Sequence, residues 1–315
     1  MTKQRPILTV TVNPALDVYT HVHRLSPQIK LRCSAPQVDP GGGGVNVSRA
    51  IHELGGSSTA FVALGGATGT QIANLLAAAG IRAQVFAAEG ETRTSFTVME
   101  DASGQHFRFV LPGPPQHANS GAMSRAVIDA TSPNGIVVLT GSLLPELPDD
   151  FYGELVALAR IRGALTIVDT HGAALRSAVK FRPDILRLNH IEAAELLGVP
   201  IGDPLQQCEA LLRRGAAGAV LVSRGEEGTV VASEAGTHWI HPPKVSVRSS
   251  VGAGDSFVGA FALRLARGSS ILEAATFGAA AAASAVLAEG TGLCRRAETE
   301  RLADEISVEA LVPAA

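Results

Sequence analysis

Short apolar runs alternate along the chain with longer segments whose apolar residues recur every three or four positions. The short runs are rich in β-branched residues and are typical of buried strands, whereas the longer segments have the spacing of amphipathic helices. Strands are expected at residues 7–12, 59–64, 136–140, 165–169, 185–188 and 219–223. Helices are expected at residues 45–54, 71–79, 150–160, 191–197, 204–213 and 256–266.

This alternation predicts a parallel sheet covered by helices on both faces, a doubly wound α/β fold. Such sheets bind ligands at the carboxyl ends of their strands, so residues that follow strands are the first candidates for a site. The chain has 315 residues, 46% of them hydrophobic, and no low-complexity linker divides it. Residues 1–315 are therefore expected to form a single domain.

Two segments break the alternation, at residues 17–38 and 92–111. Both read as extended chain; in the second, Phe96 and Val98 alternate with polar residues, and Phe107 and Phe109 do so after a turn. We expect a small antiparallel sheet outside the main domain, formed by about residues 17–40 and 91–112. A sheet of this size cannot bury both faces, so it is expected to cover the active site or a second subunit.

Charge and cysteine content indicate which partners and which cellular compartment to expect. The formal net charge is −3, which gives no field that favours nucleic acid or anionic membranes, and neither partner is expected. The Ala-rich stretch at 274–288 is shorter than the ~20 residues that span a bilayer and is expected to be a buried helix. Three widely spaced cysteines suggest no disulfide framework and fit a reducing cytoplasm.

One glycine-rich string, at residues 250–260, has the composition of an anion site. Gly252 and Gly254 permit a tight turn that points backbone N–H groups at one place, and an apolar helix starts there. Asp255 lies at the rim, where a carboxylate can accept a proton from a hydroxyl that attacks a bound phosphate. The alternative, that Asp255 only caps the helix, has equal weight on this string alone.

A second string, at residues 39–50, has four glycines before another helix. A ligand can approach such backbone closely, and Asn46 in the first helical turn can bind sugar hydroxyls. A flexible linker is the alternative, although linkers rarely lead straight into an amphipathic helix. Neither string matches the P-loop or the dinucleotide fingerprint, so phosphate binding is expected to use another framework.

Together these strings make the chain similar to pfkB-type sugar kinases of the ribokinase-like superfamily, and within it to the minor bacterial 6-phosphofructokinases. The order and spacing of the matching pieces carry the resemblance. They are Asn13-Pro14-Ala15-Leu16-Asp17, Lys30-Leu31-Arg32-Cys33, the four-glycine string, Gly65-Gly66-Ala67-Thr68-Gly69, Thr140-Gly141-Ser142-Leu143, Asn189 with Glu192, and the string ending in Gly254-Asp255. The resemblance implies a ribokinase-like three-layer α/β/α sandwich with a small antiparallel β-sheet lid.

The resemblance also implies residue roles. Asp255 matches the catalytic base, and the backbone at 251–254, with Gly252, Ala253 and Gly254, matches the anion hole for the transferred phosphate. The positions matching contacts to sugar hydroxyls are Asp17, Gly42, Gly43 and Asn46. Those near the substrate phosphate or its approach are Lys30, Arg32, Arg93, Arg108 and Ser142. For each arginine taken singly, a solvated surface charge is the alternative.

Further positions match the nucleotide and metal sites. Asn189 and Glu192 resemble an element that acts on Mg²⁺ mainly through water, although a helix capping box has the same spacing. The nucleotide-binding positions are Arg187, Asn189, Ser223, Gly225 and Gly228. A monovalent cation, K⁺, would lie at Ser249, Val251, Ala285, Ala288 and Gly290. Departures from close relatives are Arg187-Leu188 in place of Lys-Pro, Arg224 in place of an apolar residue, and Ala288 in place of Asn.

The implied reaction is Mg-ATP-dependent phosphorylation of the 1-hydroxyl of fructose 6-phosphate to fructose 1,6-bisphosphate. Kinases of fructose 1-phosphate and of tagatose 6-phosphate are the alternatives; their glycine string commonly has Lys where this chain has Gly43. A catalytically silent binder of nucleotide or sugar phosphate is an alternative of another class, but it would not need both Asp255 and the anion-hole glycines. A homodimer through the lid is expected.

Overall fold

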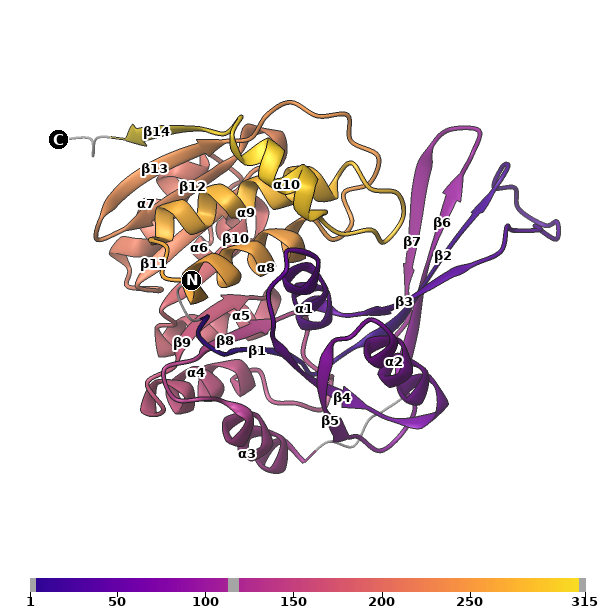
Figure 1. The fold of residues 1–315 in the computed structure, drawn as a ribbon, viewed down its shortest axis with the longest axis horizontal. Coiled ribbons are helices and arrows are strands. Elements are labelled where there is room, and N and C mark those ends of the chain that lie inside the picture. The colour runs from indigo at the N-terminus through magenta and orange to yellow at the C-terminus, as the bar shows by residue number, and fades with distance from the viewer. Residues whose placement is uncertain (1–3, 113–118, 312–315) are drawn as a thin grey trace.

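A large twisted sheet forms the centre of the molecule, and a smaller sheet projects from one side of it (Figure 1). This computed structural model describes residues 4–112 and 119–311. Within them the central sheet has ten strands in the order β14-β13-β12-β11-β10-β9-β8-β1-β4-β5. The strands are β1 (Ile7–Thr11), β4 (Thr59–Leu64), β5 (Arg82–Ala87), β8 (Ile136–Thr140), β9 (Leu165–Asp169), β10 (Ile185–Asn189), β11 (Ala219–Ser223), β12 (Thr229–Ser233), β13 (Gly236–His241) and β14 (Ser307–Leu311).

The sheet is parallel from β5 to β11, as the sequence predicted, although β5 itself was not among the expected strands. Beyond β11 the sheet continues in a way that was not expected. β12, β13 and β14 extend it beyond β11 as antiparallel strands. β12 and β13 are joined by a two-residue turn and have no helix between them. A hairpin has no helix between its strands, so a search for alternating strands and helices does not detect it.

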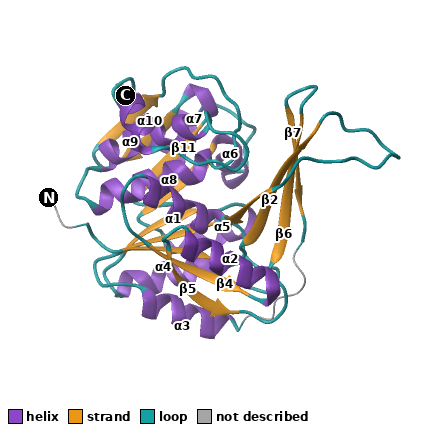
Figure 2. Cartoon of the chain, turned by 45° about the vertical axis from the view of Figure 1, so that its right-hand side comes forward, coloured by secondary structure: helices purple, strands orange, loops and turns teal. Residues whose placement is uncertain are grey.

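Helices cover both faces of the sheet (Figure 2). One face carries α3 (Ser120–Ala130), α4 (Phe151–Ile161), α5 (Gly172–Ala178), α6 (His190–Leu197) and α7 (Pro204–Arg213). The other carries α1 (Gly43–Glu53), α2 (Gly66–Ala78), α8 (Ala253–Ala266) and α9 (Ile271–Ala285), with α10 (Arg296–Ala303) packed on α9. Alternate residues of each central strand face these two layers, which is the predicted doubly wound arrangement.

The predicted strands agree closely with the structure, and the predicted helices agree less well at their starts. α1, α2 and α8 each begin before the predicted residue because their glycine-rich strings form the first helical turn. Most of the Ala-rich segment forms α9, and nearly all the alanines of this helix are buried in the core, as expected. No helix in the described part of the chain is long and apolar enough to cross a membrane.

The smaller sheet, called the lid here, consists of β3 (Gln37–Gly41), β2 (Ala15–Val22), β6 (Arg93–Glu100) and β7 (Gln105–Val110), in that order. Its four strands lie in the two segments where the sequence predicted a small sheet. The expectation that it is antiparallel is wrong at its centre, because β2 and β6 run parallel. β2 follows β1 and β6 follows β5, so both strands leave the same edge of a parallel sheet in the same direction.

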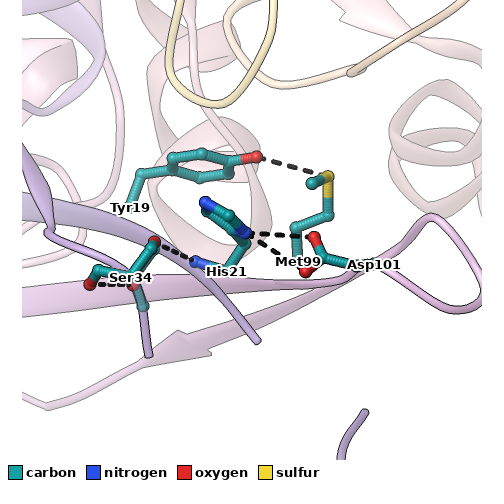
Figure 3. A network of polar contacts seen from close by, with 6 residues as sticks. Tyr19, His21, Ser34, Met99 and Asp101 are labelled. Carbon is teal, nitrogen blue, oxygen red and sulfur yellow. Dashed lines mark hydrogen bonds and ion pairs between the residues drawn. The ribbon is translucent and has the colours of Figure 1, made fainter. Parts of the chain in front are cut away.

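Side-chain contacts join the strands of the lid. The His21 imidazole lies 3.0 Å from the Asp101 carboxylate, and the backbone N–H of His21 donates to the Ser34 hydroxyl (Figure 3). The Tyr19 hydroxyl lies 3.4 Å from the Met99 sulfur. These contacts connect β2 with β6 and with the loop before β3, so the lid is cross-linked along its length.

Close packing of α1 on α8 leads to a first prediction. An added Cβ at Gly259 would lie 2.8 Å from the Ala50 Cβ and 2.9 Å from the Val47 carbonyl oxygen, so Gly259→Ala forces the two helices apart. Overpacking of this kind destabilises a protein by about 1–3 kcal/mol. Chemical denaturation should show this loss for Gly259→Ala and a much smaller change for Gly202→Ala, where the nearest atom is 3.8 Å away. Equal stability of the two variants would contradict the tight contact.

Candidate active site

A cavity of about 380 Å³ lies where the carboxyl ends of the parallel strands meet the lid. It opens beside the boundary of β1 and β8, the point in a doubly wound sheet where ligands bind. Its walls combine residues from the ends of β1, β8, β9 and β10, the starts of α1 and α8, and the lid. The side chains and backbone around it are polar and charged throughout most of the lining.

Asp255 lies in the first turn of α8, at the floor of the cavity. Gly252 forms the N-cap with φ 76°, a conformation that suits glycine, and an added Cβ there would lie 2.6 Å from Leu293. The turn leaves the first backbone N–H groups of the helix without intrahelical partners, which favours an anion. Enclosure of Asp255 by protein raises its pKa to about 6, and the nearby charge of Asp169 acts in the same direction.

The Asn46 amide holds the Asp255 carboxylate in place. Asn46 Nδ2 donates to Asp255 Oδ2 at 2.9 Å, and Asn46 Oδ1 accepts from Arg49 Nη1 at 3.2 Å. Arg49 in turn pairs with Asp39 at 3.0 Å, and Asp39 also accepts a hydrogen bond from the Thr291 hydroxyl. This series of hydrogen bonds fixes the orientation of the Asn46 amide, so its NH₂ group faces Asp255.

The lid side of the cavity is basic. Arg93 and Arg108 both line it and stand near the carboxylate of Asp17. Burial lowers the pKa of Arg93, and the positive charge of Arg108 lowers it further. Burial raises the pKa of Asp17, against the effect of these arginines. Two guanidinium groups that face the cavity beside the carboxylate of Asp17 form a site suited to an anion.

Hydrogen bonds orient Arg93 toward the cavity. Its Nε donates to Asn13 Oδ1 at 2.9 Å, and its Nη2 donates to the Asn13 carbonyl oxygen at 3.1 Å. Asn13 Nδ2 donates to the Ser142 hydroxyl at 3.1 Å. The loop after β1 therefore connects the lid arginine with the serine that follows β8.

The opposite end of the cavity is acidic, with Arg187 among the carboxylates. Arg187 Nη1 lies 3.3 Å from Asp169 Oδ1, and the same guanidinium approaches the place of a Cβ on Gly254 to 3.1 Å. Burial raises the pKa of Glu192, and the charge of Asp169 raises it further. Carboxylates that face one cavity and disfavour each other's charge are suited to a hard divalent cation.

Asn189 and Glu192 form a capping box at the start of α6. The Asn189 side chain accepts hydrogen bonds from the backbone of Ile191 and Glu192, and Glu192 Oε2 accepts from the Asn189 N–H at 2.8 Å. The capping alternative is therefore realised. Glu192 nevertheless lines the cavity, so one residue has both a structural contact and a place at the site.

The cavity brings together a large part of the predicted site. The predicted residues that line it are Asp17, Gly42, Gly43, Asn46, Arg93, Arg108, Ser142, Arg187, Glu192, Gly254 and Asp255. Those outside its lining are Lys30, Arg32, Asn189, Ser223, Gly225, Gly228, Gly252, Ala253, Ser249, Val251, Ala285, Ala288 and Gly290. Lys30 and Arg32 lie in the exposed loop between β2 and β3, on the projecting lid (Figure 2).

The lining also contains residues that the sequence reading did not assign. They are Thr11, Asn13, Ala15, Ser95, Thr140, Gly141, Asp169, Thr170 and His171. A signal for several of them was present. Asp169 ends β9, and Thr170 and His171 follow it, so the rule that ligands bind after strand ends points to them. Ser95 has no such signal, since only the register of β6 turns it toward the cavity.

The comparisons with known proteins agree with this arrangement. The family model described as "pfkB family carbohydrate kinase" matches residues 10–298. The chain belongs to the pfkB family of carbohydrate kinases. As a member of this family it has the ribokinase-like fold that the sequence predicted, with the antiparallel extension and the mixed lid described above.

Two curated relatives of this carbohydrate kinase are named 6-phosphofructokinase. ATP-dependent 6-phosphofructokinase isozyme 2 of Mycobacterium tuberculosis is 37% identical over 303 residues, which cover 94% of this chain and 88% of the relative. The isozyme of the same name from Escherichia coli is 35% identical over 300 residues, which cover 94% of this chain and 97% of the relative.

Among solved structures, phosphofructokinase-2 from E. coli in complex with potassium superposes with a TM-score of 0.90 at 35% identity, covering 96% of this chain and 99% of that one. The same E. coli protein has been solved with fructose-6-phosphate and in a tetrameric inhibited form, each with a TM-score of 0.88. The likeness extends over both the central sheet and the lid, because almost all of each chain is covered.

Proposed function

We propose that this kinase transfers the γ-phosphate of ATP to the 1-hydroxyl of fructose 6-phosphate, giving fructose 1,6-bisphosphate. The observation that carries the proposal is the division of one cavity into a basic lid side, a carboxylate with a raised pKa at a helix start, and an acidic end. Relatives named 6-phosphofructokinase, and the E. coli structure with fructose-6-phosphate, support the same substrate.

The basic side is suited to the phosphate already on the sugar. Arg93 and Arg108 can pair with its oxygens, and the fork of Arg93 is oriented in advance by Asn13. Asp17 faces the same space and offers acceptors for sugar hydroxyls. Gly41 lies behind Asp17 so closely that a Cβ would come within 3 Å of all three atoms of its carboxylate group. This contact holds the carboxylate toward the cavity.

Asp255 would act as the general base. Its carboxylate accepts the proton of the attacking 1-hydroxyl while the oxygen forms a bond to the γ-phosphorus and the bond to the leaving ADP oxygen breaks. Backbone N–H groups of residues 253–255 at the start of α8 face the charge that develops on the transferred group. Val251 contributes less than expected from the sequence, because its N–H donates to the Ser249 hydroxyl.

Asp169, Arg187 and Glu192 would serve the nucleotide end. Arg187 offers a guanidinium to the ATP phosphates, beside the start of α8. Glu192 and Asp169 are suited to Mg²⁺, Glu192 mainly through water, and Mg²⁺ would neutralise the charge of the phosphate oxygens. Such an ion keeps several waters, so a small set of carboxylates is sufficient.

A monovalent cation is proposed near the start of α8, as in the E. coli protein solved with potassium. The hydroxyl of Ser249 donates to the Gly290 carbonyl at 3.0 Å, which joins the two segments that the sequence assigned to this site. Ala288 supplies no side-chain oxygen. A K⁺ site there would therefore rest on carbonyl oxygens, including those of Val251 and Ala285.

The reaction is assigned to the cytoplasm, where ATP is available and unpaired cysteines stay reduced.

Initial rates test which sugar phosphate the kinase prefers. At matched Mg-ATP, fructose 6-phosphate should be phosphorylated faster than fructose 1-phosphate or tagatose 6-phosphate. A faster rate on either rival would replace the proposed substrate, and no release of ADP with any of them would support a silent binding protein.

Asp255→Asn should slow turnover about 10²–10⁴-fold, because the amide fills similar space but cannot accept the proton. In the wild type, kcat/KM should fall as the pH drops through about 6, since the carboxylate is then protonated and inactive as a base. The residual activity of Asp255→Asn should lack this inflection, whereas titration of the substrates affects both proteins equally. Wild-type turnover in the variant would remove Asp255 from the mechanism.

Arg93→Ala should weaken binding of the sugar phosphate and leave binding of ATP nearly unchanged, because only the lid side loses a charge. A charged hydrogen-bond partner contributes about 1.5–3 kcal/mol, so KM for fructose 6-phosphate should rise roughly 10- to 150-fold. Arg24→Ala, an exposed arginine elsewhere on the lid, is the matched control. Equal losses for both substrates would indicate a role in folding instead.

The lid is proposed to pair with its copy in a homodimer. Arg93, Ser95 and Arg108 face the cavity, so alternation along the strands turns Phe96 and Phe109 to the other face. Their rings stack at 4.9 Å, and Phe109 remains 42% exposed. Apolar area on a projecting sheet favours self-association, and a two-fold axis lets one patch serve both subunits. The tetrameric form of the E. coli protein fits assembly of this kind.

Phe109→Asp should therefore convert a dimer into monomers and raise KM for the sugar phosphate, because the lid loses its support. Sedimentation velocity and steady-state kinetics measure the two effects. Val85→Asp is the control, since Val85 is also exposed but lies on β5 in the main domain. A fully active wild-type monomer would exclude the dimer.

A further inference from the structure

A second cavity, of about 390 Å³, lies at the opposite edge of the central sheet from the active site. Its walls come from the amino ends of β1, β4 and β5 and from the last turns of α1. The active-site cavity instead takes its residues from the carboxyl ends of the strands and from the first turn of α1. The two cavities are therefore separated by the length of the strands, and none of the described residues lines both.

Basic groups and hydroxyls dominate this second cavity. Arg5, Arg82 and His52 line it together with Ser57 and other hydroxyl residues. None of the described residues that line it is acidic, in a chain whose formal net charge is −3. Charge of one sign collected in a hollow attracts small ions of the opposite sign.

Arg5 lines this cavity, and two hydrogen bonds fix its guanidinium. Its Nε donates to the Asn134 carbonyl oxygen at 2.7 Å, and its Nη2 donates to the Gly135 carbonyl oxygen at 3.1 Å. Both acceptors are neutral, so the positive charge of the guanidinium is not cancelled by them. A planar fork fixed in this way loses little entropy when it binds an oxyanion.

The remaining walls are also fixed by hydrogen bonds. The Gln4 amide spans the backbone of Ser57, donating to its carbonyl oxygen at 2.6 Å and accepting from its N–H at 3.3 Å. Beneath them the Ser58 hydroxyl donates to the buried Ser48 hydroxyl at 2.9 Å, and Ser48 contacts Thr9 at 2.8 Å. These contacts give the cavity a defined polar wall rather than a loose surface notch.

Further arginines lie behind the cavity, near the loop after α1. Arg267 donates to the Gly55 carbonyl oxygen at 2.9 Å, and Arg296 approaches the place of a Cβ on Gly55 to 3.0 Å. The pKa of Arg267 is lowered by burial and by the positive charges of Arg264 and Arg296. Arg296 forms an ion pair with Glu300, which offsets its charge. Glu300 itself does not line the cavity.

We propose that this second cavity is a binding site for a small metabolite that carries an oxyanion, either a phosphate ester or a polycarboxylate, distinct from the substrates of the kinase reaction. Arg5 and Arg82 would bind the anion, with His52 and Ser57 at the rim. Its volume is close to that of the active-site cavity, so a molecule of the size of a sugar phosphate fits it.

Calorimetric titration of the full chain with inorganic pyrophosphate, and separately with malonate, tests the proposal. The two probes distinguish the sources, because binding of pyrophosphate alone indicates a phosphate ester and binding of both indicates general recognition of oxyanions. Pyrophosphate can also enter the active site, so the Arg93→Ala variant is titrated beside the wild type. Binding that survives Arg93→Ala does not depend on the basic side of the active site.

Arg82→Glu and His52→Glu each change a residue that lines the second cavity, and both residues are exposed, so the variants are expected to fold. Each should weaken the surviving binding by about tenfold or more, because each places a carboxylate in the cavity that repels the anion. Arg125→Glu makes the same change in charge on α3, away from the cavity, and should leave the binding within about twofold of wild type.

Titrations of Arg82→Glu and His52→Glu that match the wild type would overturn the proposal, as would equal weakening by Arg125→Glu. Absence of any binding that survives Arg93→Ala would also overturn it. None of these outcomes depends on which sugar the kinase phosphorylates, so failure here is separate from failure of the proposed function.

Discussion

The hydrogen bond from the Asn46 amide to the Asp255 carboxylate ties together the two helices whose first turns form the floor of the active-site cavity. A carboxylate enclosed by protein is costly to ionise, and its pKa rises accordingly. Asn46 limits that rise, because its amide donates to the charged form, and Arg49 ensures that the donor points the right way. The close approach of α1 to α8 at Gly259 makes the whole arrangement possible.

Around this centre the cavity is divided by charge. The lid contributes arginines, whereas the end of β9 and the first turn of α6 contribute carboxylates, with Arg187 of β10 near them. A doubly phosphorylated product and a nucleotide would repel each other in a site without this division. The arrangement instead gives each anion its own countercharge, while the start of α8 lies between the two ends. The main domain and the lid thus contribute different halves of one electrostatic pattern.

Much of this could be predicted from the sequence. The strings with Gly42, Asn46 and Asp255 have local signals, because glycines before a helix define backbone geometry within a few residues. The mixed lid, the strands after β11 and the contact of Asp169 with Arg187 could not be predicted in the same way. They depend on which strands become neighbours, a property of long-range packing that a periodic pattern does not encode.

The parallel pairing of β2 with β6 also bears on how the chain folds. Ala15 pairs with Arg93 and Val22 with Glu100, so the centre of the lid joins segments that are separated by β3, α1, β4, α2 and β5. Contacts between such distant segments form slowly, because the intervening chain must first lose its freedom. The part of the molecule that carries Asp17 and Arg93 is therefore expected to form late, after the core beneath it. Newly made chains would gain a packed interior before they gain a complete substrate site.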